Sequence, residues 1–299
     1  MKRNQNWKEL ALRHWQRVYL GLLLLFSVYV LLDAFVIPRS MTVVEDEGDR
    51  APALTEEAVI TDSSYSGNGI TITITRHRAY DTDIYLADIL LEDPAHIRTA
   101  FAKDTYGKNI LSPSSVIAQS HGAILAVNGD YYSARDGYVI RNGVLYRDSS
   151  AGDGQEALVI GADGSFRIVR EGDTTAEALL AEGAAQVLSF GPGLIEDGEI
   201  RYDPARGEGK ELTRNPRTAM GHYGGGHYVM LVADGRTESS EGLTVEQLAA
   251  FLHTLGLRTA YNLDGGGSTT MVFNGQVVNQ PTDGHNIEER NVSDIVYIG

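Results

Sequence analysis

The longest apolar stretch of the chain runs from Val18 to Ile37, and its only polar side chains are Ser27, Asp33 and tyrosines. Twenty helical residues span about 30 Å, the thickness of a bilayer core. Five basic residues precede the stretch, which by the positive-inside rule places the amino terminus in the cytoplasm. A cleaved signal peptide is the alternative, but no small-x-small cleavage site follows. The sequence therefore predicts a single-pass anchor at 18–37, a cytoplasmic tail at 1–17 and an extracytoplasmic body.

Beyond the anchor, short apolar runs and period-2 alternation predict a body built mainly of strands. The strictest alternation is Ile70–Thr75, which should bury one face. Other apolar runs bounded by turn residues predict strands at 85–91, 124–127, 187–190, 228–232 and 295–298.

Helical signals in the body are few. Three segments begin with capping residues: Ser112 with Pro113, Thr174 with Glu177, and Thr244 with Gln247. The pattern predicts one α+β domain at 67–299 on an antiparallel or mixed sheet, preceded by one transmembrane helix. Residues 38–66 are acidic, lack sustained periodicity and are predicted to form a flexible tether.

Charge narrows the range of partners. The chain has 299 residues and a net charge of −15, but residues 1–40 hold six Lys or Arg against two acids, a net of +4. The remainder therefore carries −19, which argues against nucleic-acid binding, because that depends on clustered cations. With no cysteine, neither disulfides nor thiolate metal sites are available.

Four polar clusters each follow an apolar strand, so the fold can hold their side chains together at one edge of the sheet scaffold. They are Asn128-Gly129-Asp130, Asn215-Pro216-Arg217-Thr218, Asp234-Gly235-Arg236 and Asp264-Gly265-Gly266-Gly267-Ser268. Carboxylates, arginines and amides in this mixture suit a ligand with both hydroxyls and an anionic group. Arginine grips phosphate bidentately, and paired carboxylates are the usual equipment for glycosidic cleavage.

The last cluster is the most informative. Its glycines allow close backbone approach to a ligand, and successive N–H groups can form an anion-binding nest. The alternative is a plain hairpin loop. The sequence requires no cofactor, although Asp130, Asp234 or Asp264 could hold Mg²⁺ or Ca²⁺. The histidines lack zinc-ligand spacing.

Together with Ala126-Val127 before the first cluster, these four motifs in this order resemble the phosphodiester glycosidase family over residues 70–299. Members remove a sugar linked through its anomeric carbon to a phosphodiester, and bacterial members are often labelled exopolysaccharide-biosynthesis proteins. The resemblance implies a site with the residues Asn128, Arg217, Asp234, Arg236, Asp264, Ser268 and Arg290. Many members read Asn-Gly-Gly-Phe-Phe where this chain has Asn128-Gly129-Asp130-Tyr131-Tyr132, which adds a carboxylate.

The leading hypothesis is therefore a membrane-anchored hydrolase that acts on a glycosyl-1-phosphodiester of a surface or exported glycan. Arg217 and the glycines Gly265, Gly266 and Gly267 would hold phosphate, and Asp264 would act as nucleophile or base. Asp234 would orient Arg217 or the sugar, while Asn128, Asp130 and Arg236 would bind hydroxyls. The alternative hypothesis is a non-catalytic glycan-binding or assembly factor for exopolysaccharide export.

Overall fold

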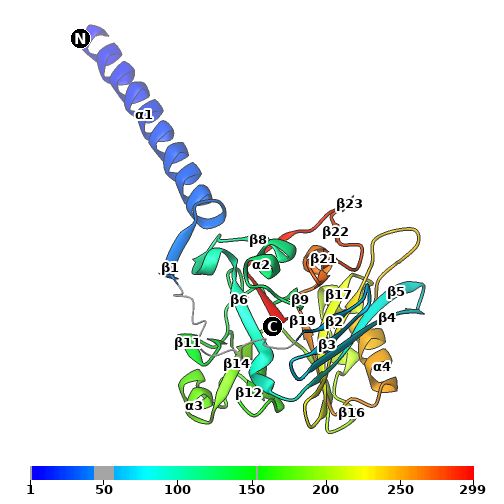
Figure 1. Cartoon of the computed structure of the whole chain (residues 1–299). Coiled ribbons are helices and arrows are strands. Elements are labelled where there is room, and N and C mark those ends of the chain that lie inside the picture. Colours follow the sequence, from blue (N-terminus) through cyan, green and yellow to red (C-terminus); the bar gives the residue numbers. More distant parts are fainter. Residues whose placement is uncertain (1, 44–56, 153) are drawn as a thin grey trace.

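A long amino-terminal helix extends away from the body of the protein (Figure 1). The computed structural model describes residues 2–43, 57–152 and 154–299. The helix is α1 (Lys2–Phe35), and its segment Leu12–Phe35 has a mean hydropathy of 2.2 with none of it buried. This length and hydropathy suit a membrane span and equally suit a signal sequence.

The acidic segment 38–66 contains strands that its composition did not indicate. β1 (Arg39–Val43) pairs with β7 (Thr105–Lys108), and β2 (Val59–Ile60) and β3 (Ser64–Gly67) extend the edge of the largest sheet. The described parts of this segment are therefore tied to the body by backbone hydrogen bonds, and the expected boundary after residue 66 falls within β3. Residues 44–56 of the expected tether lie outside the described part.

The largest sheet has nine strands in the order β16-β15-β19-β17-β18-β5-β4-β3-β2, and every pairing in it is antiparallel. The strands not yet defined are β4 (Ile70–Ala79), β5 (Thr82–Leu91), β15 (Gly193–Glu196), β16 (Glu199–Ile200), β17 (Arg217–Gly224), β18 (His227–Ala233) and β19 (Thr259–Leu263). The alternation at Ile70–Thr75 predicted β4 correctly, since Ile70 and Ile72 are fully buried.

Two five-stranded antiparallel sheets face it. One has the order β21-β20-β9-β25-β6 and the other β11-β10-β14-β12-β13. Their bounds are β6 (Ile97–Phe101), β9 (Leu125–Asn128), β20 (Met271–Phe273), β21 (Gln276–Val277), β25 (Asp294–Ile298), β10 (Val139–Arg141), β11 (Val144–Arg147), β12 (Glu156–Gly161), β13 (Phe166–Arg170) and β14 (Ala184–Leu188). Short pairs join β8 (Ser112–Pro113) to β24 (Asn291–Val292) and β22 (Thr282–Asp283) to β23 (Asn286–Ile287).

The main core lies between the large sheet and the two smaller ones. Met230 and Leu263 of the large sheet share it with Val127 and Val296 of one small sheet and Leu158 of the other. Burying such side chains stabilises the fold by about 1.5–3 kcal/mol each. Antiparallel sheets packed face to face confirm the predicted α+β class.

Helices cover the outer faces of the sheets. α4 (Val245–Thr254) packs on the large sheet (Figure 1), while α2 (Ser114–Ser120) and α3 (Ala176–Ala181) cover the smaller ones. The predicted capping box of Thr244 and Gln247 is present, but α3 is capped by Thr175 and not by Thr174. The remaining helical turns are 3₁₀: η1 (Pro94–His96), η2 (Ala102–Asp104), η3 (Pro204–Arg206), η4 (Gly209–Leu212) and η5 (Gly266–Ser268).

Candidate active site

A pocket of about 380 Å³ opens where the large sheet meets the smaller ones, a size typical of small-ligand sites. It collects Arg217, Arg236, Asp264 and Arg290 from widely separated parts of the chain. Five basic and three acidic side chains line it, which is unusual in so acidic a body. They are Arg135, Lys210, Arg217, Arg236 and Arg290, and Glu208, Glu211 and Asp264. The pocket therefore favours an anionic ligand.

Asp264 lies in a turn that crosses between layers. β19 before it belongs to the large sheet and β20 after it pairs with β9 of a smaller sheet, so the segment is not a hairpin. Its carboxylate is 9 % exposed and accepts a hydrogen bond from the N–H of Gly265 at 2.9 Å. Burial raises the pKa of Asp264, while a hydrogen bond from Ser268 and the charge of Arg290 oppose this. Asp264 is thus a desolvated carboxylate at the wall of the pocket.

Asn128 supports Asp264 and does not line the pocket. Its side chain is fully buried, donates to the carbonyl oxygen of Asp264 at 2.6 Å and accepts from the hydroxyl of Thr218 at 2.7 Å. Because β9 carries Asn128 and β17 carries Thr218, the amide links the two layers directly beneath Asp264. These contacts do not support the expectation that Asn128 binds substrate hydroxyls, because its side chain is engaged by Asp264 and Thr218.

The N–H groups of Gly265 and Gly266 are not free to form the expected anion nest. The N–H of Gly265 bonds to the Asp264 carboxylate and that of Gly266 to the carbonyl of Pro216. The glycines instead leave space for arginines. A Cβ on Gly266, whose φ is +64°, would lie 2.8 Å from Nη2 of Arg236, and one on Gly267 would lie 2.7 Å from Arg290. Side chains here would push both guanidinium groups away.

Arg217 has no carboxylate within ion-pair distance in the part of the chain that the structure describes. It is 6 % exposed and donates to the carbonyl oxygens of Leu243 at 2.8 Å, Lys210 at 2.7 Å and Thr213 at 2.9 Å. Burial lowers the pKa of Arg217 to about 10. Since none of the described hydrogen bonds uses Nη1, that nitrogen can still donate to an anion.

Arg236 and Arg290 complete the basic wall. Among the described residues, Arg236 likewise forms no ion pair and donates to Asn215 Oδ1 at 3.1 Å; burial, and then the charge of Arg290, lower its pKa. Arg290 is paired with Asp283 at 2.6 Å. Of the three arginines Arg217, Arg236 and Arg290, the first two are therefore the ones without an acid partner among the described residues.

Asp130 is part of a buried ionic cluster and does not reach the pocket. Its carboxylate is fully buried and accepts from Arg141 at 2.8 Å and from the N–H of Ser189 at 2.7 Å. Arg141 also pairs with Asp294 at 2.8 Å, and burial together with the nearby Asp130 raises the pKa of Asp294 to about 7. These contacts do not support the expectation that Asp130 binds substrate, because its oxygens accept from groups inside the protein.

Asp234 is also directed elsewhere. It is 4 % exposed, does not line the pocket, and accepts from the side chain of Asn279 at 2.9 Å and the N–H of Gln280 at 3.0 Å. Burial raises the pKa of Asp234 to about 6. It makes no ion pair with Arg217 among the described residues, so the expected orienting role is not supported. Its contacts fix the 279–280 loop.

Several pocket residues were missed in the sequence. Tyr131, Arg135 and Phe190 line it, as do Lys210 and Glu211. The guanidinium of Arg135 lies 4.2 Å above the centre of the Phe190 ring. Tyr131 belongs to the motif that begins at Asn128, although no role was predicted for it. Arg135, Phe190, Lys210 and Glu211 lie outside the four motifs, so no sequence signal marks them.

No group of three or more His, Asp or Glu suited to a metal ion occurs among the described residues.

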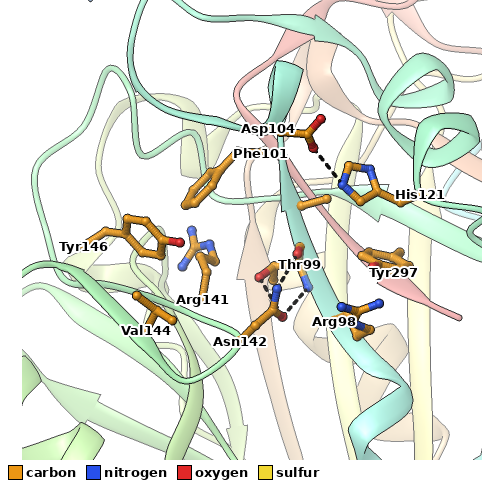
Figure 2. Close-up of a pocket in the computed structure, with 11 residues that line it drawn as sticks. Arg98, Thr99, Phe101, Asp104, His121, Arg141, Asn142, Val144, Tyr146 and Tyr297 are labelled. Atoms are coloured by element: carbon orange, nitrogen blue, oxygen red, sulfur yellow. Dashed lines mark hydrogen bonds and ion pairs between the residues drawn. The ribbon is translucent and has the colours of Figure 1, made fainter. Parts of the chain in front are cut away.

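A separate cavity of about 50 Å³ lies beside Arg141, and Figure 2 shows the ion pair of Asp104 with His121 and the contacts of Thr99 with Asn142 at its wall. It shares no lining residue with the Asp264 pocket.

The geometry defines an α+β protein of packed antiparallel sheets, with a buried carboxylate and arginines around one small-ligand pocket. A family model described as phosphodiester glycosidase matches residues 121–299. The chain belongs to the phosphodiester glycosidase family, as the motifs indicated.

Curated relatives agree with this assignment. The chain is 32 % identical over 187 residues to an N-acetylglucosamine-1-phosphodiester alpha-N-acetylglucosaminidase of Bos taurus, covering 56 % of this chain and 34 % of the relative. It is 29 % identical over 173 residues to the SPbeta prophage-derived uncharacterized protein YomE of Bacillus subtilis (strain 168), covering 56 % and 27 %. The chain thus spans about a third of the length of the curated relatives it matches.

Solved structures share the fold. The catalytic domain of zebrafish N-acetylglucosamine-1-phosphodiester alpha-N-acetylglucosaminidase, auto-inhibited by its pro-peptide, aligns with a TM-score of 0.62 and 23 % identity, covering 77 % of this chain and 82 % of that one. A hypothetical protein from Synechocystis aligns with a TM-score of 0.60 and 15 % identity, covering 77 % and 62 %.

Proposed function

We propose that the protein hydrolyses the bond between C1 of a sugar and the oxygen of a phosphodiester. Water supplies a hydroxyl group to C1 and its other proton passes to the phosphate product or the solvent. The C1–O electron pair stays on the phosphate oxygen, so a free sugar and a phosphate monoester are released. The observation that carries this proposal is that one pocket holds buried Asp264 beside Arg217 and Arg236, two arginines without an acid partner among the described residues.

The arginines suit the phosphate. The phosphate monoester that leaves C1 is a good leaving group, so its departure depends less on a general acid than on cations that hold its charge. Three carbonyl oxygens fix the guanidinium group of Arg217, and burial removes the water that would stabilise its positive charge. An anion bound in the pocket would stabilise that charge instead. We assign the phosphate to Arg217 and Arg236.

Asp264 suits the sugar. Its carboxylate would act either as nucleophile at C1 or as the base that activates water, and in both roles its negative charge stabilises the positive charge that develops at the anomeric carbon. Its raised pKa is typical of functional carboxylates. Ser268, which hydrogen-bonds to Asp264, would orient it.

The location of the activity follows from α1. With five basic residues before its apolar segment, α1 would anchor the body on the outer side of a membrane, next to surface or exported glycans. Mass spectrometry of the membrane-extracted protein tests this, since retention of α1 is expected. A mature terminus near Ala34 or Arg39 would instead identify a cleaved signal.

The enzymatic test uses the full-length chain in detergent. N-Acetylglucosamine 1-(methyl phosphate) is the first substrate, because the bovine relative is named for that sugar, and methyl N-acetylglucosaminide without phosphate is the comparison. We expect release of the sugar from the phosphodiester only. Asp264→Asn should abolish turnover and keep binding, while Asp163→Asn, outside the pocket, should change neither. Substrate binding without any sugar release by the wild-type chain, with that binding lost in Asp264→Asn, would favour a non-catalytic glycan-binding factor.

A further inference from the structure

A second, larger cavity continues from the Asp264 pocket. Its volume is about 610 Å³, and it shares Arg135, Phe190, Gly191 and Glu211 with the pocket. Phe190 is half-buried and carries Arg135 over its ring, so an aromatic face and a cation stand where the two spaces join. Because the pocket alone has the volume of a small-ligand site, the adjoining cavity provides room for the rest of a longer molecule.

The charges of the second cavity show what such a molecule would carry. Arg201 is paired with Glu156 at 2.7 Å and with Glu196, and Arg206 faces Asp203 at 3.8 Å. Arg135 and Arg170 have no ion pair within the described ranges, although the body is strongly acidic. Arg135, which lines both spaces together with Glu211, and Arg170, which lines only the second cavity, therefore continue the row of arginines that begins with Arg217 and Arg236.

We infer that this cavity is a second anion subsite, which binds the next phosphodiester of a chain of sugars linked through phosphates. This inference rests on the proposed function for the bond that is cleaved. The first phosphate would lie at Arg217 and Arg236, a sugar ring would pass over Phe190, and the following phosphate would reach Arg135 and Arg170. The substrate class is then a poly(glycosyl phosphate), and the arginines spaced along the groove select it over a neutral glycan.

The test compares three substrates with the full-length chain. One is N-acetylglucosamine 1-(methyl phosphate), one is a trimer of N-acetylglucosamine joined by 1→6 phosphodiesters, and one carries a single phosphodiester extended by two neutral sugars. Wild-type kcat/KM should be highest for the phosphate-linked trimer. Arg170→Gln should lower kcat/KM for the trimer about tenfold, the size of one lost charged hydrogen bond, and leave the methyl substrate within twofold. Arg167→Gln is the matched control, because Arg167 is on the same strand but pairs with Glu182 outside the cavity.

Binding to Asp264→Asn, measured by calorimetry, separates the two proposals. Trimer binding that weakens with Arg170→Gln supports the subsite even if no substrate is hydrolysed, in which case the proposed reaction alone fails. Equal preference for the neutral extension and the phosphate-linked trimer would overturn the anion subsite while the reaction stands. An equal effect of Arg170→Gln on the methyl substrate and the trimer would also overturn it.

Discussion

Arg141 provides the sharpest test of how this fold is stabilised. Its guanidinium is 2 % exposed and bridges the carboxylates of Asp130 and Asp294, both at 2.8 Å, while it also donates to two carbonyl oxygens. Arg141→Met keeps most of the apolar volume and leaves two buried carboxylates without a cation. Breaking a buried ion pair costs about 3–5 kcal/mol, so we expect the free energy of unfolding to fall by about 4 kcal/mol.

The sign of the pH dependence follows from Asp294. Burial already raises its pKa to about 7, and loss of the Arg141 charge would raise it further. Between the unfolded pKa near 4 and this raised value, the folded state binds a proton that the unfolded state releases, so stability falls as pH rises. The destabilisation by Arg141→Met should therefore be larger at pH 8 than at pH 5. Adding Asp294→Asn removes one buried charge and should recover part of the loss at pH 8.

Urea unfolding at both pH values is the assay. Both tryptophans lie in α1, at positions 7 and 15, so near-UV circular dichroism of the tyrosines reports on the body better than tryptophan fluorescence. Arg167→Met breaks a pair at 2.7 Å with both side chains about half exposed and should cost less than about 1 kcal/mol. A comparably small effect of Arg141→Met, or a further loss on adding Asp294→Asn, would refute the reasoning.

Four other predictions concern activity. Arg217→Lys should lower kcat/KM nearly as much as Arg217→Ala, because an ammonium group cannot replace the carbonyl contacts of the guanidinium and also bind phosphate; wild-type kcat/KM in the lysine variant would contradict this. Because burial raises the pKa of Asp264, kcat/KM should fall on acidification at a higher pH than an exposed aspartate would give, and an acid limb at or below about pH 4 would disagree. Gly267→Ala would place a Cβ 2.6 Å from Oδ1 of Asp283 and displace Arg290, lowering kcat/KM by up to about 100-fold; unchanged kinetics would show that Arg290 is dispensable. In ¹⁸O-labelled water the label should enter the C1 hydroxyl of the sugar, and label in the phosphate would identify a phosphodiesterase.

The sequence predicted the elements better than the directions of their side chains. Alternation marked β4, and apolar runs marked β9, β18 and β25, because burial imposes those patterns directly. The segment 39–43 was missed because its five residues are exposed and pair with only one strand, so no burial pattern marks it.

For the candidate site, the motifs likewise predicted which segments meet better than where each side chain points. Arg217, Arg236, Asp264 and Arg290 do meet at one pocket, since each follows or begins an element at the same rim. Asp130 also lies in one of the four motifs, but its carboxylate forms an ion pair with Arg141. Arg141 ends β10, whose sequence contains no motif. A motif gives no information on such a partner, because the contact depends on tertiary packing. The positions of Phe190 and Glu211 in the pocket could not be predicted either, because they also depend on tertiary packing.

The order of strands has a consequence for any attempt to produce the body of the protein as a shorter fragment. The family match begins at His121, yet β5 pairs with β18 through seven residue pairs and β6 pairs with β25 through five. A fragment that begins at residue 121 would lack β5 and β6, so the backbone groups of β18 and β25 that pair with them would be unpaired. Unpaired strand edges promote aggregation with other chains. The unit that folds is therefore longer than the segment that the family model matches, and expression designs should retain the strands that precede residue 121.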